Sequence, residues 1–432
     1  MPFFSKIFNR VKQVFNPTDV YASQRLLLRG SLIYGLIPYR LVVKDGVSSL
    51  QTSVLGFIAA ILSMITFGIS FMATILNQMN LMEFFLQSPI SNFGGNLNLI
   101  TSFLSITSVY VCSLVLRKKL KRMLETLSCI DGKFVELGID ISHRNALWFN
   151  LKSCFVATVA CGIYTATTIA FLLQRKSGNQ RSYSVVVTHF WPYFVLTNLI
   201  LTFLSFTRLI CTRFKAVNQI LRNLCGSEST KSFNVTISPL KSFKQSQDSS
   251  SNLLAERKLV EVVKDVCGIH DDLSDTCLLA EEYFALKMLT IVGIGFLIIV
   301  FNLYYVMEIA FGQIPDEFQE ESYKFLIFLV FQVAMNILGI LCIIQSSCAI
   351  SNENRNCSIY VHKLMNTTTD DIAKEKLLQF SLQLIHRKVK FTALNLFPLD
   401  RTLIFTIAGA ATTYLIILFQ FSNQNRFPNV KT

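Results

Sequence analysis

The chain has 432 residues, of which 52% are hydrophobic and only 16% carry a charged side chain. Soluble domains carry about a quarter charged residues, so this composition excludes an ordinary soluble protein and favours a membrane protein. The formal net charge is +13, but the basic residues flank apolar segments instead of forming a basic domain. We therefore expect no nucleic-acid partner and instead contact between these basic flanks and anionic membrane lipid.

The first 53 residues precede any span and are predicted to lie in the cytoplasm. Residues 1–16 combine three basic residues with apolar residues at helical spacing, and they lack the uncharged core and cleavage site of a signal peptide. This pattern predicts an amphipathic helix at the membrane interface. The apolar stretch 26–43 is interrupted by two arginines, a glycine and a proline, so we interpret it as an approach to the first span.

Seven segments are long and apolar enough to cross a bilayer, which requires about 20 mostly apolar residues. They are residues 54–76, 97–116, 154–173, 186–209, 286–309, 325–344 and 403–421. The predicted fold class is an all-α membrane protein with seven transmembrane helices and cytoplasmic helical extensions. The predicted division is a cytoplasmic segment 1–53, four spans within 54–209, a cytoplasmic loop 210–285, two spans within 286–344, a cytoplasmic segment 345–402, a last span 403–421 and an extracellular tail 422–432.

The cytoplasmic segments are themselves patterned. Residues 252–285 and 370–395 carry apolar side chains at helical spacing and predict amphipathic helices that pack together. The intervening stretch 226–251 is rich in Ser, Gln and Lys, which predicts disorder. Pro398 must interrupt the helix that precedes the last span, and Asp400 can cap the helix that follows. The last helix is thus predicted to be broken into a cytoplasmic half and a membrane half.

The orientation follows from the distribution of Lys and Arg, which concentrate in cytoplasmic loops. With the N-terminus inside, the inner segments hold 33 of the 40 Lys and Arg residues and the outer segments hold six. Five of the inner Lys and Arg residues directly follow the second span, within 117–122, whereas the outer loop 77–96 has no Lys or Arg. The outer loop 174–185 contains three and is the exception to this distribution. We expect a plasma-membrane protein with a cytoplasmic N-terminus and an extracellular C-terminus.

The sequence carries no sign of enzymatic chemistry. Its 11 cysteines form no CxxC pair or metal-ligand spacing, its five histidines are scattered, and no catalytic triad, P-loop or dinucleotide fingerprint is present. We therefore expect no metal, no cofactor and no catalysis.

Aromatic and polar residues gather in the outer halves of the fourth, fifth and sixth spans. Small-molecule pockets commonly combine aromatic walls with a few polar groups. The candidate ligand-binding residues are Asn302, Tyr304, Tyr305, Glu308, Gln332, Asn336, His189, Trp191 and Tyr193. Each of them also has a simpler interpretation, as an interhelical hydrogen bond or as part of an aromatic belt at the membrane interface.

The last span carries Gln420, and an amide in an apolar span should face protein or water. Thr413, Ile417 and Gln420 are spaced i, i+4 and i+7, so they share one helical face, with Tyr414 and Phe421 beside it. One interpretation is a single hydrogen bond to a neighbouring helix. The other is a polar ring that lines a pore, built from one helix of each of several subunits.

At this point the chain resembles a known family. A Thr-Tyr pair at 413–414, five apolar residues and a Gln-Phe pair at 420–421 resemble the C-terminal signature of insect gustatory receptors. The stretch 391–400 and the seven-span layout resemble that family as well, and residues 269–305 resemble its fructose-type and broadly tuned branch.

The resemblance implies a homotetrameric, ligand-gated, non-selective cation channel that a small-molecule tastant opens, with or without related receptor subunits. The last helix would line the pore, with Gln420 and Phe421 near the gate.

Two other classes of membrane protein also have multiple spans. A G-protein-coupled receptor of the odorant type also has seven spans, but its N-terminus is outside, and no DRY-like triplet follows the third span here. Secondary transporters often contain repeats with interrupted spans in corresponding halves. This chain shows no repeat, and a break precedes only the last span, so the C-terminal signature favours the channel.

Overall fold

The computed structural model describes residues 17–44, 47–76, 89–174, 183–225, 249–310 and 319–426. Its helices are α2 (Val20–Ile33), α3 (Val54–Leu76), α4 (Pro89–Val115), α5 (Arg117–Glu136), α6 (His143–Gln174), α7 (Tyr183–Leu224), α8 (Ser249–Ala310), α9 (Gln319–Thr367), α10 (Asp371–His386) and α11 (Thr402–Arg426). Two antiparallel pairs join β1 (Tyr39–Lys44) to β2 (Val47–Thr52) and β3 (Thr392–Ala393) to β4 (Phe397–Pro398).

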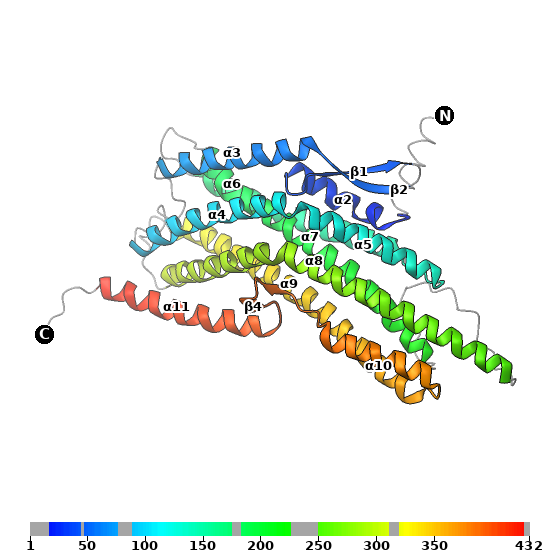
Figure 1. Ribbon diagram of the computed structural model, residues 1–432. Coiled ribbons are helices and arrows are strands. Elements are labelled where there is room, and N and C mark those ends of the chain that lie inside the picture. Colours follow the sequence, from blue (N-terminus) through cyan, green and yellow to red (C-terminus); the bar gives the residue numbers. More distant parts are fainter. Residues whose placement is uncertain are drawn as a thin grey trace.

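Within the described residues, seven helices are long and apolar enough to cross a membrane. They are α3, α4, α6, α7, α8, α9 and α11, and the seven predicted spans fall on them one by one. In Figure 1 these helices run side by side as a bundle. The prediction of an all-α, seven-helix membrane protein is thus confirmed.

Several helices continue far beyond the spans. The 62 residues of α8 correspond to a length of about 90 Å, roughly three times the thickness of the hydrocarbon core. The predicted helix over 252–285 is the first half of α8 and runs without a break into the fifth span. The extensions of α7, α8 and α9 pack with α5 and α10 into a helical base, at the lower right in Figure 1.

The approach to the first span is held against α7. Ser31 Oγ on α2 donates a hydrogen bond to Asn198 Oδ1 on α7 over 2.7 Å, and Ser205 Oγ on α7 donates to Gln24 Oε1 on α2 over 2.6 Å. The stretch 26–43 forms the second half of α2 and most of β1. The amphipathic helix predicted within 1–16 lies outside the described residues. Residues 226–248 of the predicted disordered stretch 226–251 also lie outside them, and residues 249–251 of that stretch form the start of α8.

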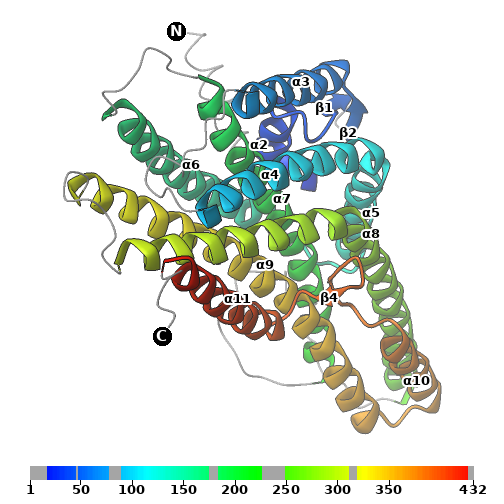
Figure 2. The same ribbon diagram turned by 90° about the vertical axis from the view of Figure 1, so that its left-hand side faces the viewer.

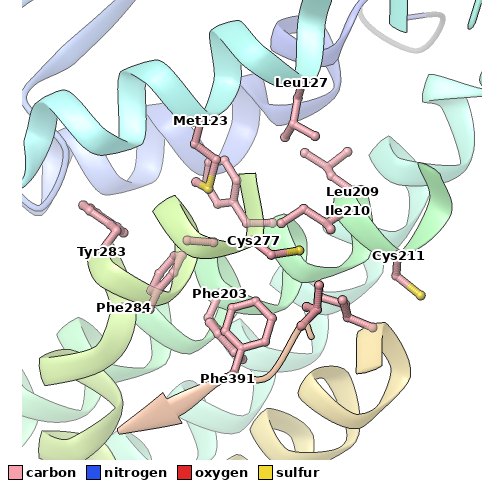
Figure 3. Close-up of a cluster of buried hydrophobic side chains, with 14 of the residues drawn as sticks. Met123, Leu127, Phe203, Leu209, Ile210, Cys211, Cys277, Tyr283, Phe284 and Phe391 are labelled. Atoms are coloured by element: carbon pink, nitrogen blue, oxygen red, sulfur yellow. The ribbon is translucent and has the colours of Figure 1, made fainter. Parts of the chain in front are cut away.

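Aromatic, aliphatic and sulfur-containing side chains form a buried cluster where the helices of the base meet (Figure 3). The Phe203 ring on α7 meets the Phe284 ring on α8 edge-on at 5.2 Å and the Phe391 ring at 5.8 Å. Phe391 belongs to the segment between α10 and β3 and is 4% exposed. This one side chain therefore ties the connection before α11 to the core.

Ion pairs hold the periphery of the base. Lys133 Nζ on α5 donates to Asp272 Oδ2 on α8 over 2.5 Å, and this hydrogen bond raises the pKa of the Lys133 ammonium. Arg387, which follows α10, pairs with Asp271 at 3.2 Å and with Asp275 at 2.7 Å. Both contacts fix neighbouring helices to α8.

The last helix is broken, as predicted, but the break is longer than a kink at Pro398. The helix predicted over 370–395 ends at His386, and residues 387–401 carry the β3–β4 pair, with Pro398 in β4. The reason is tertiary: the backbone N and Oγ1 of Thr392 both donate to Glu281 Oε1 on α8, over 3.1 and 2.6 Å, which holds this segment extended. Asp400 Oδ1 then accepts from the backbone N of Thr402 over 2.9 Å and starts α11.

Candidate functional site

A cavity lies inside the bundle, between α4, α7, α8 and α9, and its volume is about 70 Å³. Its polar lining consists of Asn98, Ser102, Ser105, Thr188, His189, Tyr193, Thr197, Gln332 and Asn336. Its apolar lining consists of Leu99, Pro192, Leu196, Ile200, Ile291, Ile294, Ile298 and Met335, with Gly295 and Gly339. None of these lining residues carries a carboxylate, ammonium or guanidinium group, so the lining suits a neutral molecule that forms hydrogen bonds and offers no pair of acids for proton transfer.

A chain of hydrogen bonds forms one wall of this cavity. Asn302 Nδ2 on α8 donates to Gln332 Oε1 on α9 over 3.0 Å, and Gln332 Nε2 donates to the Tyr193 hydroxyl on α7. Asn336 Nδ2 donates to the backbone oxygen of Gln332 over 2.8 Å. In an apolar medium each of these amides requires a partner, so the chain locks three helices into one register.

Gly295 keeps space open beside that wall. A Cβ atom at this position would lie 3.1 Å from Ile340 Cδ1 and 3.7 Å from Asn336 Oδ1. The missing side chain therefore leaves the Asn336 carbonyl oxygen accessible from the cavity.

His189 faces the cavity from α7 with an unsatisfied nitrogen. Its Nε2 atom is buried and has no hydrogen-bond partner within the described part of the chain. On α4, Asn98 and Ser102 are spaced i, i+4 and line the same cavity. A buried polar atom without a partner is costly, and a bound molecule would supply one. The arrangement can thus hold a small molecule between polar groups of different helices.

Tyr193 packs against an aromatic cluster centred on Tyr164. The Tyr164 ring on α6 lies 4.5 Å from the Tyr193 ring, stacks on Phe328 at 5.5 Å and meets Phe190 edge-on at 5.6 Å. Such a cluster gives the Tyr193 hydroxyl a rigid position, because packed rings have few alternative rotamers.

The structure brings some of the nine candidate residues together and separates others. His189, Tyr193, Gln332 and Asn336 line the cavity. Asn302 supports Gln332 and, with Tyr305, lines a smaller neighbouring cavity of about 10 Å³.

The three remaining candidates do not line this cavity. Tyr304 is buried in an aromatic cluster that also contains Phe325, and Glu308 is 9% exposed. The Trp191 ring lies against Tyr34 at 6.0 Å, away from the cavity, because residues two apart on a helix point to different faces.

The predicted site residues did not include Asn98 and Ser102 of α4, which line the cavity, or Tyr164, which packs against Tyr193. Asn98 and Ser102 lie one helical turn apart in an apolar span, and this spacing was the available signal. It is a weak one, because small polar residues in spans usually bond to the backbone of their own helix, as Thr101 and Ser105 do here. Only the packing of α4 on α8 shows which polar side chains face the cavity.

The last helix is attached to the bundle by one face. Ala411 is buried, Leu415 and Leu418 pack against the aromatic cluster, and the Tyr414 ring lies 6.0 Å from Phe296 on α8. Only 11% of the α11 span is buried, compared with 61% for the α7 and α8 spans. Figure 2 shows α11 on the outside of the bundle, alongside α8 and α9.

The predicted pore face of α11 is uncovered. Thr413, Ile417 and Gln420 are exposed, and at about 100° per residue they lie roughly opposite the packed face. Phe421, at 57% exposure, lies beside them. In the single chain, α11 thus exposes a face with two polar side chains, Thr413 and Gln420, that a neighbouring molecule can cover.

Comparison with known proteins agrees with this architecture. A family model described as 7tm chemosensory receptor matches residues 24–425. The chain is 29% identical over 422 residues to the Drosophila melanogaster protein named gustatory receptor 28b, covering 96% of this chain and 89% of that protein. It is also 29% identical to gustatory receptor 28a of the same organism, covering 96% and 94% of the two chains.

Solved structures share the fold. The insect olfactory receptor OR5 from Machilis hrabei superposes with a TM-score of 0.64 and 11% sequence identity, covering 97% of this chain and 99% of that one. Its structure in complex with eugenol gives a TM-score of 0.59.

These matches identify a receptor and not an enzyme. The chain is a multi-pass membrane protein, it belongs to the 7tm chemosensory receptor family, and its relatives in that family are insect gustatory receptors.

Proposed function

We propose that this chain is the subunit of a homotetrameric, non-selective cation channel that a small-molecule tastant opens, alone or with related receptor subunits. The observation that carries the proposal is the uncovered face of α11, with Thr413, Ile417 and Gln420 opposite the face that packs on the bundle. An amide is costly against lipid. Four copies around an axis would place Gln420 and Phe421 against water in a shared pore, which removes that cost.

The proposed orientation has the N-terminus in the cytoplasm and the C-terminus outside. Its support is the concentration of 33 of the 40 basic residues in the segments assigned to the inside. The sequons at Asn234 and Asn366 fall in two of these segments, so neither should carry glycan; sugar on either residue would contradict the orientation.

The proposed ligand site is the cavity lined by His189, Tyr193, Gln332 and Asn336. Its support is the unsatisfied Nε2 of His189 opposite polar groups of α4 and α9. Because Gln332 links α9 to Asn302 on α8 and to Tyr193 on α7, a bound molecule would change the packing of α8, on which α11 rests. The cavity would thereby be coupled to the pore.

The test is expression of this chain alone in cells that lack other chemoreceptors. A panel of sugars, bitter compounds and other nutrients should evoke an inward cation current that persists when G-proteins are blocked. Gln420→Ala should change conductance or gating, whereas Gln379→Ala, at an exposed glutamine of α10, should not. A current that requires active G-proteins, or permeation that is unchanged in Gln420→Ala, would refute the proposal.

A further inference from the structure

A second cavity, of about 880 Å³, lies where the base meets the last span. It opens to solvent and is bordered by the extension of α9, the end of α10, the link 387–401 and the first residue of α11. Its charged lining consists of Arg355, Lys388, Lys390, Arg401 and Asp400. It shares no residue with the cavity between α4, α7, α8 and α9.

The four cations of this basic cavity have no anionic partner among the residues that the structure describes. Within the described ranges none of them forms an ion pair; Arg355 donates only to the Asn352 side chain, over 3.5 Å. The carboxylate of Asp400 is engaged by Thr402, whose backbone N and Oγ1 both donate to it. All four cations are exposed, and Asp400 offsets only one of their charges, so the cavity presents a net positive, solvent-accessible surface that attracts an anion.

The neighbouring Arg387 shows the contrast. It comes directly before Lys388, but it turns toward α8 and pairs with Asp271 and Asp275. Carboxylates are thus within reach of this link, and they neutralise Arg387 but not the cations that line the cavity.

The basic cavity lies beside the start of the last candidate membrane span. Arg401 directly precedes the apolar part of α11, which begins at Thr402. Arg355 lies 11 residues beyond the end of the predicted sixth span at residue 344, or about 16 Å along the helix axis. Leu396 and Phe405, at 70% and 78% exposure, flank Arg401 in the chain. In a bilayer that covers the apolar part of α11, this segment would place its cations near the headgroup layer and its exposed apolar side chains near the acyl chains.

We propose that the basic cavity binds the phosphorylated inositol headgroup of an anionic phospholipid of the inner leaflet, an inference that rests on the orientation proposed above. Phosphate monoesters carry the charge that four clustered cations require, and arginine matches their geometry with two parallel hydrogen bonds. Basic pockets at the cytoplasmic side of membrane helices bind such headgroups. A headgroup held by Arg355, Lys388 and Arg401 would fasten α9, the link and the start of α11 to each other, so the lipid would regulate the pore helix.

The experiment measures binding to the purified full-length protein in detergent, by microscale thermophoresis with dioctanoyl phosphatidylinositol 4,5-bisphosphate. We expect saturable binding of this lipid and none of dioctanoyl phosphatidylcholine. The variant K388Q/K390Q/R401Q should bind at least about tenfold more weakly, since each basic residue near a lipid surface contributes measurably to such binding. The matched variant K264Q/K363Q/K374Q removes three exposed lysines that do not line the cavity and should bind like the wild type.

Further arms separate the alternatives. The variant K388R/K390R keeps the charge and should retain binding, and a melting temperature of K388Q/K390Q/R401Q close to that of the wild type excludes a folding defect. Inositol 1,4,5-trisphosphate tests the source of the phosphate. Weaker binding than that of the lipid supports a membrane phospholipid, whereas equal binding would contradict it and assign the site to a soluble phosphate.

Two further outcomes overturn the proposal: absence of saturable lipid binding to the wild type, or equal weakening in the two Gln variants. If the wild type binds no lipid and K388Q/K390Q/R401Q also loses its oligomeric state, a neighbouring subunit fills the cavity instead. Because binding is read without a current, failure of the channel proposal would not decide this test.

Discussion

Asn302 on α8 donates a hydrogen bond to Gln332 on α9 over 3.0 Å, and the two side chains are 3% and 4% exposed. Gln332 in turn donates to the Tyr193 hydroxyl on α7. One amide side chain thus connects three helices around the cavity between α4, α7, α8 and α9.

Gln332→Leu should therefore impair the response to ligand. Leucine fills similar space but removes the hydrogen bonds that Asn302 and Tyr193 form with Gln332, and such a loss costs about 1–3 kcal/mol in a buried site. We expect the half-maximal ligand concentration to rise about tenfold or more, measured as current at constant surface expression. Ser346→Ala is the control, because the Ser346 hydroxyl bonds only within its own helix. An unchanged ligand response in Gln332→Leu would show that the cavity does not bind the ligand.

The buried ion pair between α5 and α7 should be a strong determinant of stability. Arg213, 1% exposed, contacts Asp131 at two points, Nε to Oδ1 at 2.9 Å and Nη2 to Oδ2 at 2.6 Å. Arg213→Met removes one partner and leaves a mostly buried carboxylate, which should cost about 3–5 kcal/mol. The double variant Arg213→Met/Asp131→Leu should recover much of that loss.

The matched control for this pair is the half-exposed ion pair of Lys119 and Glu282. Lys119→Met should cost at most about 1 kcal/mol. The measurement is the melting temperature of the purified protein by fluorescence-detected size exclusion. Equal effects of Arg213→Met and Lys119→Met would contradict the prediction.

Lys287 should be a source of instability. Its side chain is 1% exposed, its Nζ has no hydrogen-bond partner among the described residues, and it lies 3.3 Å from the centroid of the Tyr283 ring. A cation–π contact offsets only part of the cost of burying an ammonium group in a span. Lys287→Met keeps the length without the charge and should raise stability by about 1–3 kcal/mol.

The control is Lys152→Met, at an exposed position of α6, which should change the melting temperature little. A lower melting temperature in Lys287→Met than in the wild type would show that the ammonium group has a stabilising partner in the assembled protein.

Gly35 and Gly138 form a matched pair for backbone effects. Both have positive φ angles, +72° and +76°, but a Cβ on Gly35 would lie 2.4 Å from the backbone N of Ala60, whereas a Cβ on Gly138 meets nothing within 4 Å. Gly138→Ala should cost about 1–2 kcal/mol for the left-handed conformation alone. Gly35→Ala must also displace α3, so its yield of folded protein should be clearly lower. Equal yields of the two variants would contradict the close approach.

The extent of the spans and the class of the protein were readable along the chain. Hydropathy is a local property, so residues such as 54–76 and 286–309 identified their helices without knowledge of any neighbour. The pairs at 413–414 and 420–421 identified the family for the same reason, because a motif is contiguous. The capping of α11 by Asp400 also followed from a few adjacent residues.

The site and the break before α11 were not readable in this way. The helix predicted over 370–395 ends at His386 because Glu281, more than 100 residues earlier in the chain, holds Thr392 extended. His189 and Trp191 looked equivalent in the sequence, yet one lines the cavity and the other lies against Tyr34. Which face of a helix meets which neighbour depends on packing between distant segments, and hydropathy along one segment carries no information about that partner.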